Sequence, residues 1–251
     1  MHMDFDPQKT DRLADTLAGV RPEEVLEWSW RELGPAVAMS TAFGPSGVVL
    51  VDMAQKVAPE LPVFTIDTGY LFPETLALKE RIEARYDVQI ESLHPRLSVP
   101  EQDRACGPDL YSRDPDRCCA MRKVEPLQRK LAGLDGWVAG LRRDQSHTRA
   151  GVRVVEGYRI SSGRTIAKIN PLAAWTRKQV WDYIADNDLP YNSLMDHGYS
   201  SIGCRPCTRP AAPGANERAG RWAGTGKTEC GMHQPLMAVE IPEAEGQLAA
   251  G

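Results

Sequence analysis

The sequence predicts an α/β fold with an open, mostly parallel sheet and helices on both faces. Short apolar segments that have the character of strands alternate with longer segments that have the character of helices, as in βαβ units. Short apolar strands of this kind indicate a sheet that is covered on both sides. With 251 residues, the chain is long enough to bury a core of its own.

The predicted elements follow one another along the chain. A first helix begins at Arg21-Pro22, with proline in its first turn, and ends before Gly34. Strands are predicted at 36–39, 62–66, 88–93 and 137–141. Helices are predicted at 48–57, 73–86 and 118–131. Short β segments follow between 152 and 169, and Thr176 opens a capping box for a helix to about residue 187.

Composition restricts the class of protein. No apolar run has the length of a signal peptide core or a membrane span, so we expect a cytoplasmic protein with no membrane partner. Because thiols stay reduced in the cytoplasm, six cysteines indicate metal binding or catalysis rather than disulfides. A formal net charge of −4 argues against nucleic acid as a partner. Basic residues gathered in a few loops instead suggest a small anionic ligand.

The loop after the first predicted strand is a candidate ligand site, because ligands of open sheets lie beyond the carboxyl ends of the strands. It contains Ser40, Thr41, Phe43 and Gly44, and it leads into a helix N-terminus that suits an oxyanion. An ordinary strand-to-helix turn explains these small residues equally well. Since the loop has no Walker-type lysine, the sequence disfavours an ordinary P-loop NTPase.

Two further segments follow predicted strands. Asp67 comes after the second strand and could meet a ribose or a base, although aspartate also suits any tight turn. Arg142 and Arg143 come after the fourth strand, where two guanidinium groups could grip a phosphate at two points. A solvated charged loop is the alternative for this pair.

Four cysteines form two pairs that suit a metal site. Cys118 and Cys119 are adjacent, and Cys204 and Cys207 form a C-x-x-C motif. Four thiolates are the usual ligands of a [4Fe-4S] cluster or of a structural zinc ion. Zinc ligands are generally spaced more widely than an adjacent pair, which favours the cluster without excluding zinc. Buried thiols, a vicinal disulfide or a redox pair are the alternatives.

Cys230 lies apart from these pairs and is a candidate nucleophile. Lys227 and His233 are each three residues away and could hold positive charge near the sulfur, which would lower its pKa. A lone cysteine in a tail is usually inert. Arg218 and Arg221 precede it, however, and indicate a basic segment that folds over an anion.

Together these motifs resemble the sulfonucleotide reductase family, and in particular the assimilatory adenosine 5′-phosphosulfate (APS) reductases. The resemblance extends from about residue 36 to His233 and is most specific in the two cysteine pairs and in the ending 227–233, Lys-Thr-Glu-Cys-Gly-Met-His. It implies an adenine-nucleotide α-hydrolase-like fold related to the PP-loop pyrophosphatases. Those relatives carry an aspartate in the first loop that this chain lacks, as expected of an enzyme that does not cleave ATP.

The resemblance implies thioredoxin-dependent reduction of APS to sulfite and AMP in assimilatory sulfate reduction. Cys230 would attack the sulfate sulfur to give an S-sulfocysteine, from which thioredoxin or glutaredoxin would release sulfite. The four paired cysteines would hold a [4Fe-4S] cluster that does not carry the reducing electrons. The first loop and Asp67 would hold the adenosine, and the protein would assemble as a homo-oligomer. The groups implied around the phosphosulfate are Lys123, Arg149, Arg218, Arg221 and His233.

The same resemblance predicts three parts: an N-terminal helical segment (1–35), a nucleotide- and cluster-binding α/β domain (36–210) and a mobile catalytic segment (211–251). One alternative is a reductase of the 3′-phosphorylated nucleotide (PAPS), whose extra phosphate could meet Arg142, Arg143 or Arg153. Another is an iron–sulfur PP-loop tRNA thiolase, which would need the missing loop aspartate and ATP. A zinc-binding interaction module would leave Cys230 without a role.

Overall fold

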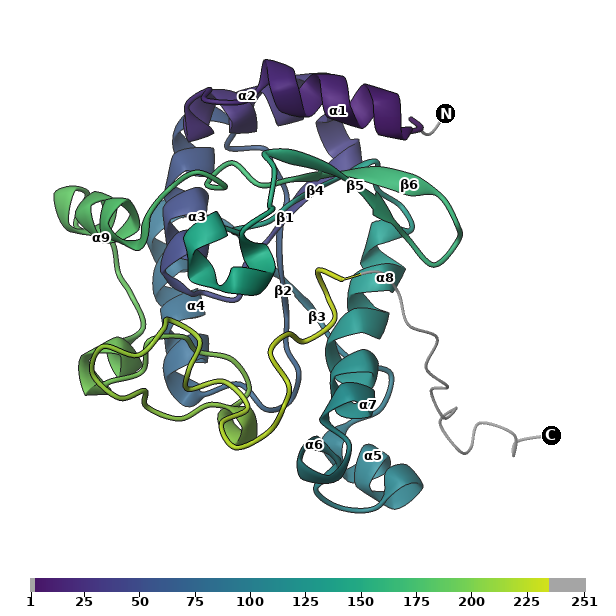
Figure 1. Ribbon diagram of the computed structural model, residues 1–251, viewed down its shortest axis with the longest axis vertical. Coiled ribbons are helices and arrows are strands. Elements are labelled where there is room, and N and C mark those ends of the chain that lie inside the picture. The colour runs from purple at the N-terminus through teal and green to yellow at the C-terminus, as the bar shows by residue number, and fades with distance from the viewer. Residues whose placement is uncertain (1–2, 235–251) are drawn as a thin grey trace.

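A computed structural model describes residues 3–234, and a six-stranded sheet in the order β3-β2-β1-β4-β6-β5 forms its centre (Figure 1). The strands are β1 (Val37–Ser40), β2 (Val63–Ile66), β3 (Glu91–Leu93), β4 (Gly136–Val138), β5 (Val155–Arg159) and β6 (Thr165–Ile169). Neighbouring strands are parallel throughout, except for the antiparallel edge hairpin β5–β6. The predicted open, mostly parallel sheet is confirmed.

Nine α-helices accompany the sheet in the described residues. They are α1 (Pro7–Thr16), α2 (Pro22–Leu33), α3 (Pro45–Val57), α4 (Pro73–Tyr86), α5 (Val99–Cys106), α6 (Leu110–Arg113), α7 (Pro115–Cys119), α8 (Glu125–Leu131) and α9 (Arg177–Asp186). Helices α5 and α6 lie between the predicted strand 88–93 and the predicted helix 118–131, where no helix was predicted. The Ser98-to-Glu101 capping box at the start of α5 is a signal that could have revealed it.

Local signals account for several of these boundaries. Gly34 ends α2 with a φ of +50°, a conformation that favours glycine. Thr176 opens α9 as predicted, because its hydroxyl accepts from Gln179 N while the Gln179 side chain accepts from Thr176 N. Strand β3 is shorter than the predicted 88–93, since the backbone N–H groups of Val88 and Ile90 are engaged by Glu83 of α4.

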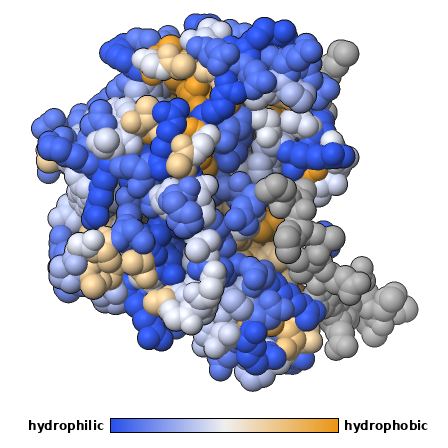
Figure 2. Space-filling model, in the orientation of Figure 1, coloured by the Kyte–Doolittle hydropathy of each residue, from blue (hydrophilic) through white to orange (hydrophobic). Residues whose placement is uncertain are grey.

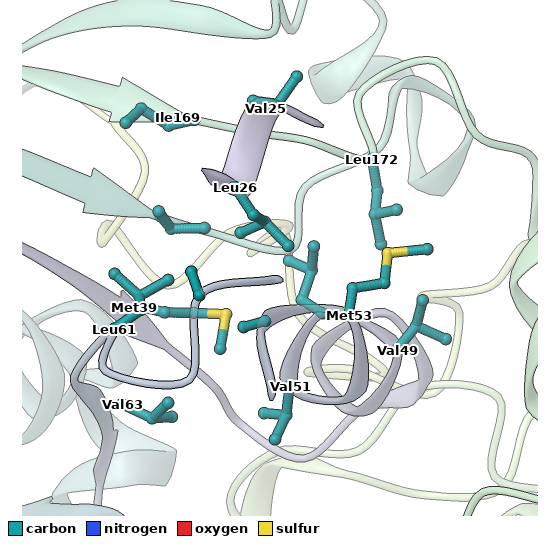
Figure 3. Close-up of a cluster of buried hydrophobic side chains, with 14 of the residues drawn as sticks. Val25, Leu26, Met39, Val49, Val51, Met53, Leu61, Val63, Ile169 and Leu172 are labelled. Atoms are coloured by element: carbon teal, nitrogen blue, oxygen red, sulfur yellow. The ribbon is translucent and has the colours of Figure 1, made fainter. Parts of the chain in front are cut away.

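Each central strand sends alternate side chains into two apolar cores. In β1, Val37 and Met39 pack into the first core and Ala38 packs into the second. The first core joins the sheet to α2, α3 and α4 (Figure 3). The second joins it to Leu127 and Leu131 of α8, so that α3 and α4 lie on one side of the sheet and α8 on the other (Figure 1). Both faces are therefore covered.

Most large apolar side chains are used in these cores. Among the described residues, Met3 and Leu76 are the large hydrophobic side chains that remain exposed. The face shown in Figure 2 is correspondingly hydrophilic over most of its area. Within residues 3–234, no helix is both long and apolar enough to cross a membrane.

One buried carboxylate ties three helices together beneath the first core. Asp52 of α3 is 3% exposed and accepts hydrogen bonds of 2.7 Å from the hydroxyls of Tyr86 on α4 and Tyr183 on α9. Lys56 Nζ lies 2.7 Å from the same carboxylate. Burial alone would raise the pKa of Asp52, but Lys56 and the two hydroxyls hold it below its ordinary value of 3.8.

We predict that Asp52→Asn lowers the free energy of unfolding at pH 7 by about 1–3 kcal/mol, because hydrogen bonds to a charged acceptor are lost. The folded pKa is depressed, so this contribution is fully present above pH 4 and is lost as the pH falls through the folded pKa. Urea unfolding at pH 7 and pH 3 measures it. Asp182→Asn, in the exposed Lys178–Asp182 pair, is the control and should change little. An equal effect of Asp52→Asn at both pH values would contradict the assignment.

Candidate active site

An open cavity of about 210 Å³ lies at the carboxyl ends of β1, β2 and β4, where ligands of open α/β sheets bind. Its walls come from the loop after β1, from the residues that follow β2 and β4, and from the chain between 200 and 233. The predicted site residues that line it are Ser40, Thr41, Gly44, Lys123, Arg149, Arg218, Arg221, Cys230 and His233. Segments distant in sequence therefore meet at one edge of the sheet.

The loop after β1 is shaped by close contacts. Thr41 Oγ1 accepts a hydrogen bond from Phe43 N at 3.0 Å. A Cβ at Gly47 would lie 2.5 Å from that same hydroxyl, so the position requires glycine. Helix α3 follows with no side-chain cap at Gly44, and residues 44–47 line the cavity. An uncapped helix N-terminus at a cavity is suited to an anion.

Cys230 is half-buried in this cavity and its thiol is acidified. Burial alone would raise its pKa, but the Lys123 ammonium, a hydrogen bond from the Met232 backbone and the Arg221 guanidinium together lower the pKa below its ordinary value. Glu229 opposes them. A cysteine with a lowered pKa, accessible from a cavity, is equipped to act as a nucleophile.

The two residues expected to hold positive charge beside Cys230 have other contacts. Lys227 pairs with Asp116, at the start of α7. His233 stacks on Trp137 with ring centroids 5.1 Å apart, and burial together with nearby cations brings its pKa well below the ordinary value. A pKa this low does not favour the positive charge expected on His233 near the sulfur, and its catalytic role stays a prediction. Lys123 and Arg221, which the family resemblance implied, are the cations that lower the pKa of Cys230.

Four cations from two parts of the chain lie around the ring of Trp222. Its backbone has a φ of +49°, in the left-handed region that an indole side chain rarely adopts, and its N–H donates to Cys207 O at 2.9 Å. The ring is buried, and four cations lie 4.6 to 6.0 Å from its centroid. They are Lys123, Arg218, Arg221 and Lys227. Such contacts offset part of the mutual repulsion of the cations.

Glu229, which the sequence analysis did not single out, binds two of the predicted arginines. It forms a two-point pair with Arg149 and a further contact with Arg218. Burial alone would raise its pKa, but hydrogen bonds and charge from Arg149, with Arg218, hold it below the ordinary value. The sequence feature that could have indicated a role for Glu229 is its position immediately before Cys230.

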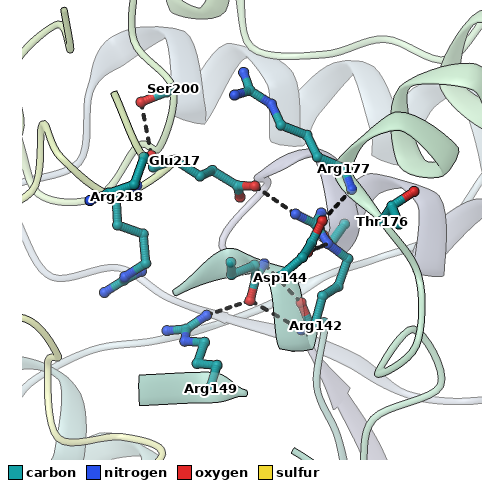
Figure 4. A network of polar contacts seen from close by, with 12 residues as sticks. Arg142, Asp144, Arg149, Thr176, Arg177, Ser200, Glu217 and Arg218 are labelled. Atoms are coloured by element: carbon teal, nitrogen blue, oxygen red, sulfur yellow. Dashed lines mark hydrogen bonds and ion pairs between the residues drawn. The ribbon is translucent and has the colours of Figure 1, made fainter. Parts of the chain in front are cut away.

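Four of the predicted binding residues do not line the cavity. Arg142 is 1% exposed and donates to Asp144, Ser46 and Glu217 (Figure 4). Arg143 is exposed, and its Nε donates to Val152 O. Phe43 is buried in the first core, and Asp67 accepts from Gly69 N in the turn after β2. Their predicted contacts with a nucleotide stay predictions.

The four paired cysteines meet in a second, much narrower cavity of about 10 Å³ beside the first. Cys118 and Cys119 end α7, and Cys204 and Cys207 reach the same cavity from a short turn in the C-terminal part of the chain. Lys123 lines both cavities. Cys106, which has no predicted role, is half-buried at the edge of a small apolar cluster.

The donor set at this second cavity is entirely sulfur. Within residues 3–234, no group of three or more His, Cys, Asp or Glu side chains is arranged to hold a metal ion. Four thiolates around one zinc ion would converge at about 2.3 Å from it. In a polynuclear cluster each thiolate binds a different iron, so the sulfurs need not converge on one point. Four thiols around one cavity are the donors that a [4Fe-4S] cluster or a structural zinc ion takes.

The chain resembles known proteins over most of its length. A sequence profile of the phosphoadenosine phosphosulfate reductase domain matches residues 36–210. A Gloeobacter violaceus protein named phosphoadenosine 5′-phosphosulfate reductase is 48% identical over 234 residues, covering 92% of this chain and 96% of that protein. A Halalkalibacterium halodurans protein named adenosine 5′-phosphosulfate reductase is 45% identical over 213 residues, covering 84% and 90%.

Solved structures agree with this relationship. A phosphate complex of phosphoadenylyl-sulfate reductase from Candida auris superposes with a TM-score of 0.72 at 35% identity, covering 82% of this chain and 98% of that chain. An ATP complex of Candida glabrata FMN adenylyltransferase gives 0.55 at 15% identity, covering 93% and 78%, which indicates a shared fold alone. The predicted adenine-nucleotide α-hydrolase-like fold is confirmed. By profile, by sequence identity and by structure, the chain belongs to the phosphoadenosine phosphosulfate reductase family.

Proposed function

We propose that this protein reduces adenosine 5′-phosphosulfate to sulfite and AMP, with Cys230 as the nucleophile and thioredoxin or glutaredoxin as the reductant, in the cytoplasm. The observation that carries the proposal is the acidified Cys230 thiol beside Lys123 and Arg221 in the cavity at the strand ends. Membership of the family supplies the reaction class. A homo-oligomer remains our expectation for the assembly.

In the first step, the Cys230 thiolate attacks the sulfur of the sulfate group and the S–O bond to the phosphate breaks. The products are an S-sulfocysteine and AMP, which leaves with the bonding electron pair. Because a thiolate approaches a group that already carries negative charge, nearby cations must stabilise the transition state. Lys123 and Arg221 supply that charge, and the loop after β1 with the N-terminus of α3 holds the nucleotide end.

In the second step, a dithiol reductant attacks Cys230 Sγ and sulfite leaves. A mixed disulfide forms, and the second thiol of the reductant resolves it, which restores the Cys230 thiol. The two electrons that reduce the sulfur come from this dithiol, which is oxidised to a disulfide. A half-buried thiol at the rim of an open cavity is consistent with access by a second protein.

We further propose that Cys118, Cys119, Cys204 and Cys207 hold a [4Fe-4S] cluster. The support is their placement around one cavity and the all-sulfur donor set. When bound, the cluster supplies local charge and ties residues 118–119 to residues 204–207. Lys123 lies four residues beyond Cys119 and lines both cavities, so it orients the anion beside the cysteine site.

The surroundings of three arginines that could bind a 3′-phosphate favour APS over PAPS as the substrate. A 3′-phosphate would need cationic partners of its own. Arg142 is buried against Glu217 and Asp144, Arg153 pairs with Asp11 and Asp15, and Arg143 is outside the cavity. Among the relatives compared, two are named for the phosphorylated nucleotide and several for APS, so names alone do not decide.

Cys230→Ser should bind nucleotide normally and lose sulfite formation by on the order of 10³-fold or more, because a neutral hydroxyl is a poor nucleophile. In the wild-type protein, APS without reductant should leave one added SO₃ on the peptide that contains Cys230, measured by mass spectrometry. Cys106→Ser is the control and should keep both properties. Finding the adduct on Cys106 would refute the assignment.

Anaerobically purified protein should absorb broadly in the visible range and contain about four iron and four acid-labile sulfide ions per chain. Replacing Cys118 or Cys204 with serine should remove this absorption because a ligand is lost. Cys230→Ser should retain it, since that thiol lies outside the ligand set. A colourless protein with stoichiometric zinc would show that the proposed cluster is wrong.

The value of kcat/KM should be at least about tenfold higher for APS than for PAPS, a difference of about 1.4 kcal/mol. The physical reason is that Arg142 and Arg153 are paired with carboxylates and Arg143 lies outside the cavity, so none of them is placed to bind the 3′-phosphate. Both nucleotides must be measured at one ionic strength, because salt screens such contacts. Equal or greater efficiency with PAPS would reverse the substrate assignment.

A further inference from the structure

The carboxylate of Glu229 is held between two arginines and is 8% exposed. Arg149 binds it at two points, with 2.8 Å from Nε to Oε1 and 2.8 Å from Nη2 to Oε2. Oε2 also accepts from Arg218 Nη2, and Oε1 from the Thr148 hydroxyl, both at 3.1 Å. Because guanidinium and carboxylate are both planar, a two-point pair fixes orientation as well as position. The peptide bond to Cys230 transmits that position to the nucleophile.

Three of the five N–H groups of Arg149 are engaged by the protein while this contact holds. Its third nitrogen, Nη1, donates to Gln145 Oε1 at 2.6 Å. Arg218 is partly committed, since its Nη2 also donates to the backbone oxygen of Thr228 at 3.0 Å. Both arginines thus bind the segment 228–229, directly before Cys230.

Lys123 and Arg221 differ from these arginines. Neither has a carboxylate partner within the part of the chain that the structure describes. Arg221 Nε is buried and, among the same residues, has no hydrogen-bond partner. Both side chains line the cavity that contains Cys230. A buried donor without a partner beside a cavity indicates that a ligand completes its contacts.

We propose that Glu229 is a positioning residue, which fixes Cys230 through Arg149 and Arg218 while Lys123 and Arg221 face the phosphosulfate. The inference rests on the proposed function, because it divides the cations of that site into two roles. Arg149, predicted to grip the substrate, acts through Glu229 instead. Lys123 and Arg221, which have no carboxylate partner among the described residues, equal in number the two negative charges of the phosphosulfate group.

Glu229→Gln keeps the shape of the side chain and removes its charge. Release of AMP from APS in a single turnover should slow by about tenfold to a hundredfold, because misplacing reacting atoms by about 1 Å has effects of this size. Binding of APS, measured in a Cys230→Ser background, should be unchanged or tighter, since no group facing the substrate is lost. Arg149→Lys keeps a cation but loses the two-point pair, and should show the same pattern.

The double variant Glu229→Gln/Arg149→Lys should be no slower than the slower single variant, because both break one contact. Glu83→Gln is the matched control: the half-buried carboxylate of Glu83 on α4 binds Lys79 of the same helix and the backbone N–H of Ile90 beyond it, and the variant should react at the wild-type rate. A wild-type rate for Glu229→Gln would overturn the proposal. So would a loss of APS affinity in Arg149→Lys with no loss of rate at saturation.

Hydrogen exchange tests the same contact without substrate. In Glu229→Gln, amide exchange in the peptide 224–234 should become faster, while exchange in the strands stays at the wild-type rate. Unchanged exchange in that peptide would contradict the positioning role. If the wild-type chain consumed neither APS nor PAPS, the proposed function would fail, and the exchange result would still decide whether Glu229 holds the Cys230 segment.

Discussion

Mutual repulsion among cations is the constraint on which the site depends. Four basic side chains surround the buried ring of Trp222, and like charges at such spacing destabilise one another unless they are offset. The indole face offsets part of the repulsion, and the carboxylates of Glu229 and Asp116 neutralise part of the charge. The positive charge that remains acts on Cys230 and lowers its pKa. Further neutralisation of these cations would raise the pKa of Cys230, and less of the reactive thiolate would then be present.

Lys123 connects this charge balance to the cysteine cavity. A π-helical turn, Ala120–Val124, joins α7 to α8 and separates Cys119 from Lys123 by less than one turn. The wider π turn holds one more residue than an α turn, and such turns are frequent at functional sites. The same backbone therefore sets the positions of two thiols and of the cation that lines both cavities. A change at the cysteines would be expected to move the ammonium group beside Cys230.

Much of this arrangement could be predicted from sequence, because local signals specify it. The Thr176 capping box and Gly34 predicted helix boundaries that the structure contains. The strand order and the partners of Arg142 could not be predicted, since they depend on residues about 75 to 100 positions away, such as Glu217 and Ser46. Proximity along the chain indicated Lys227 and His233 as cations beside Cys230, whereas Lys123, which is distant in sequence, followed from the family resemblance alone.

Two ion pairs explain how a segment with little regular structure is positioned accurately. The loop after β4 supplies Arg142, which binds Glu217 (Figure 4). The same loop supplies Arg149, which binds Glu229 of the C-terminal segment. Strand β4 lies between β1 and β6 at the centre of the sheet. Since both arginines follow this central strand, the segment is held relative to the loop after β1, its neighbour. The thiol of Cys230 therefore takes its position from the sheet, although no strand or helix carries it.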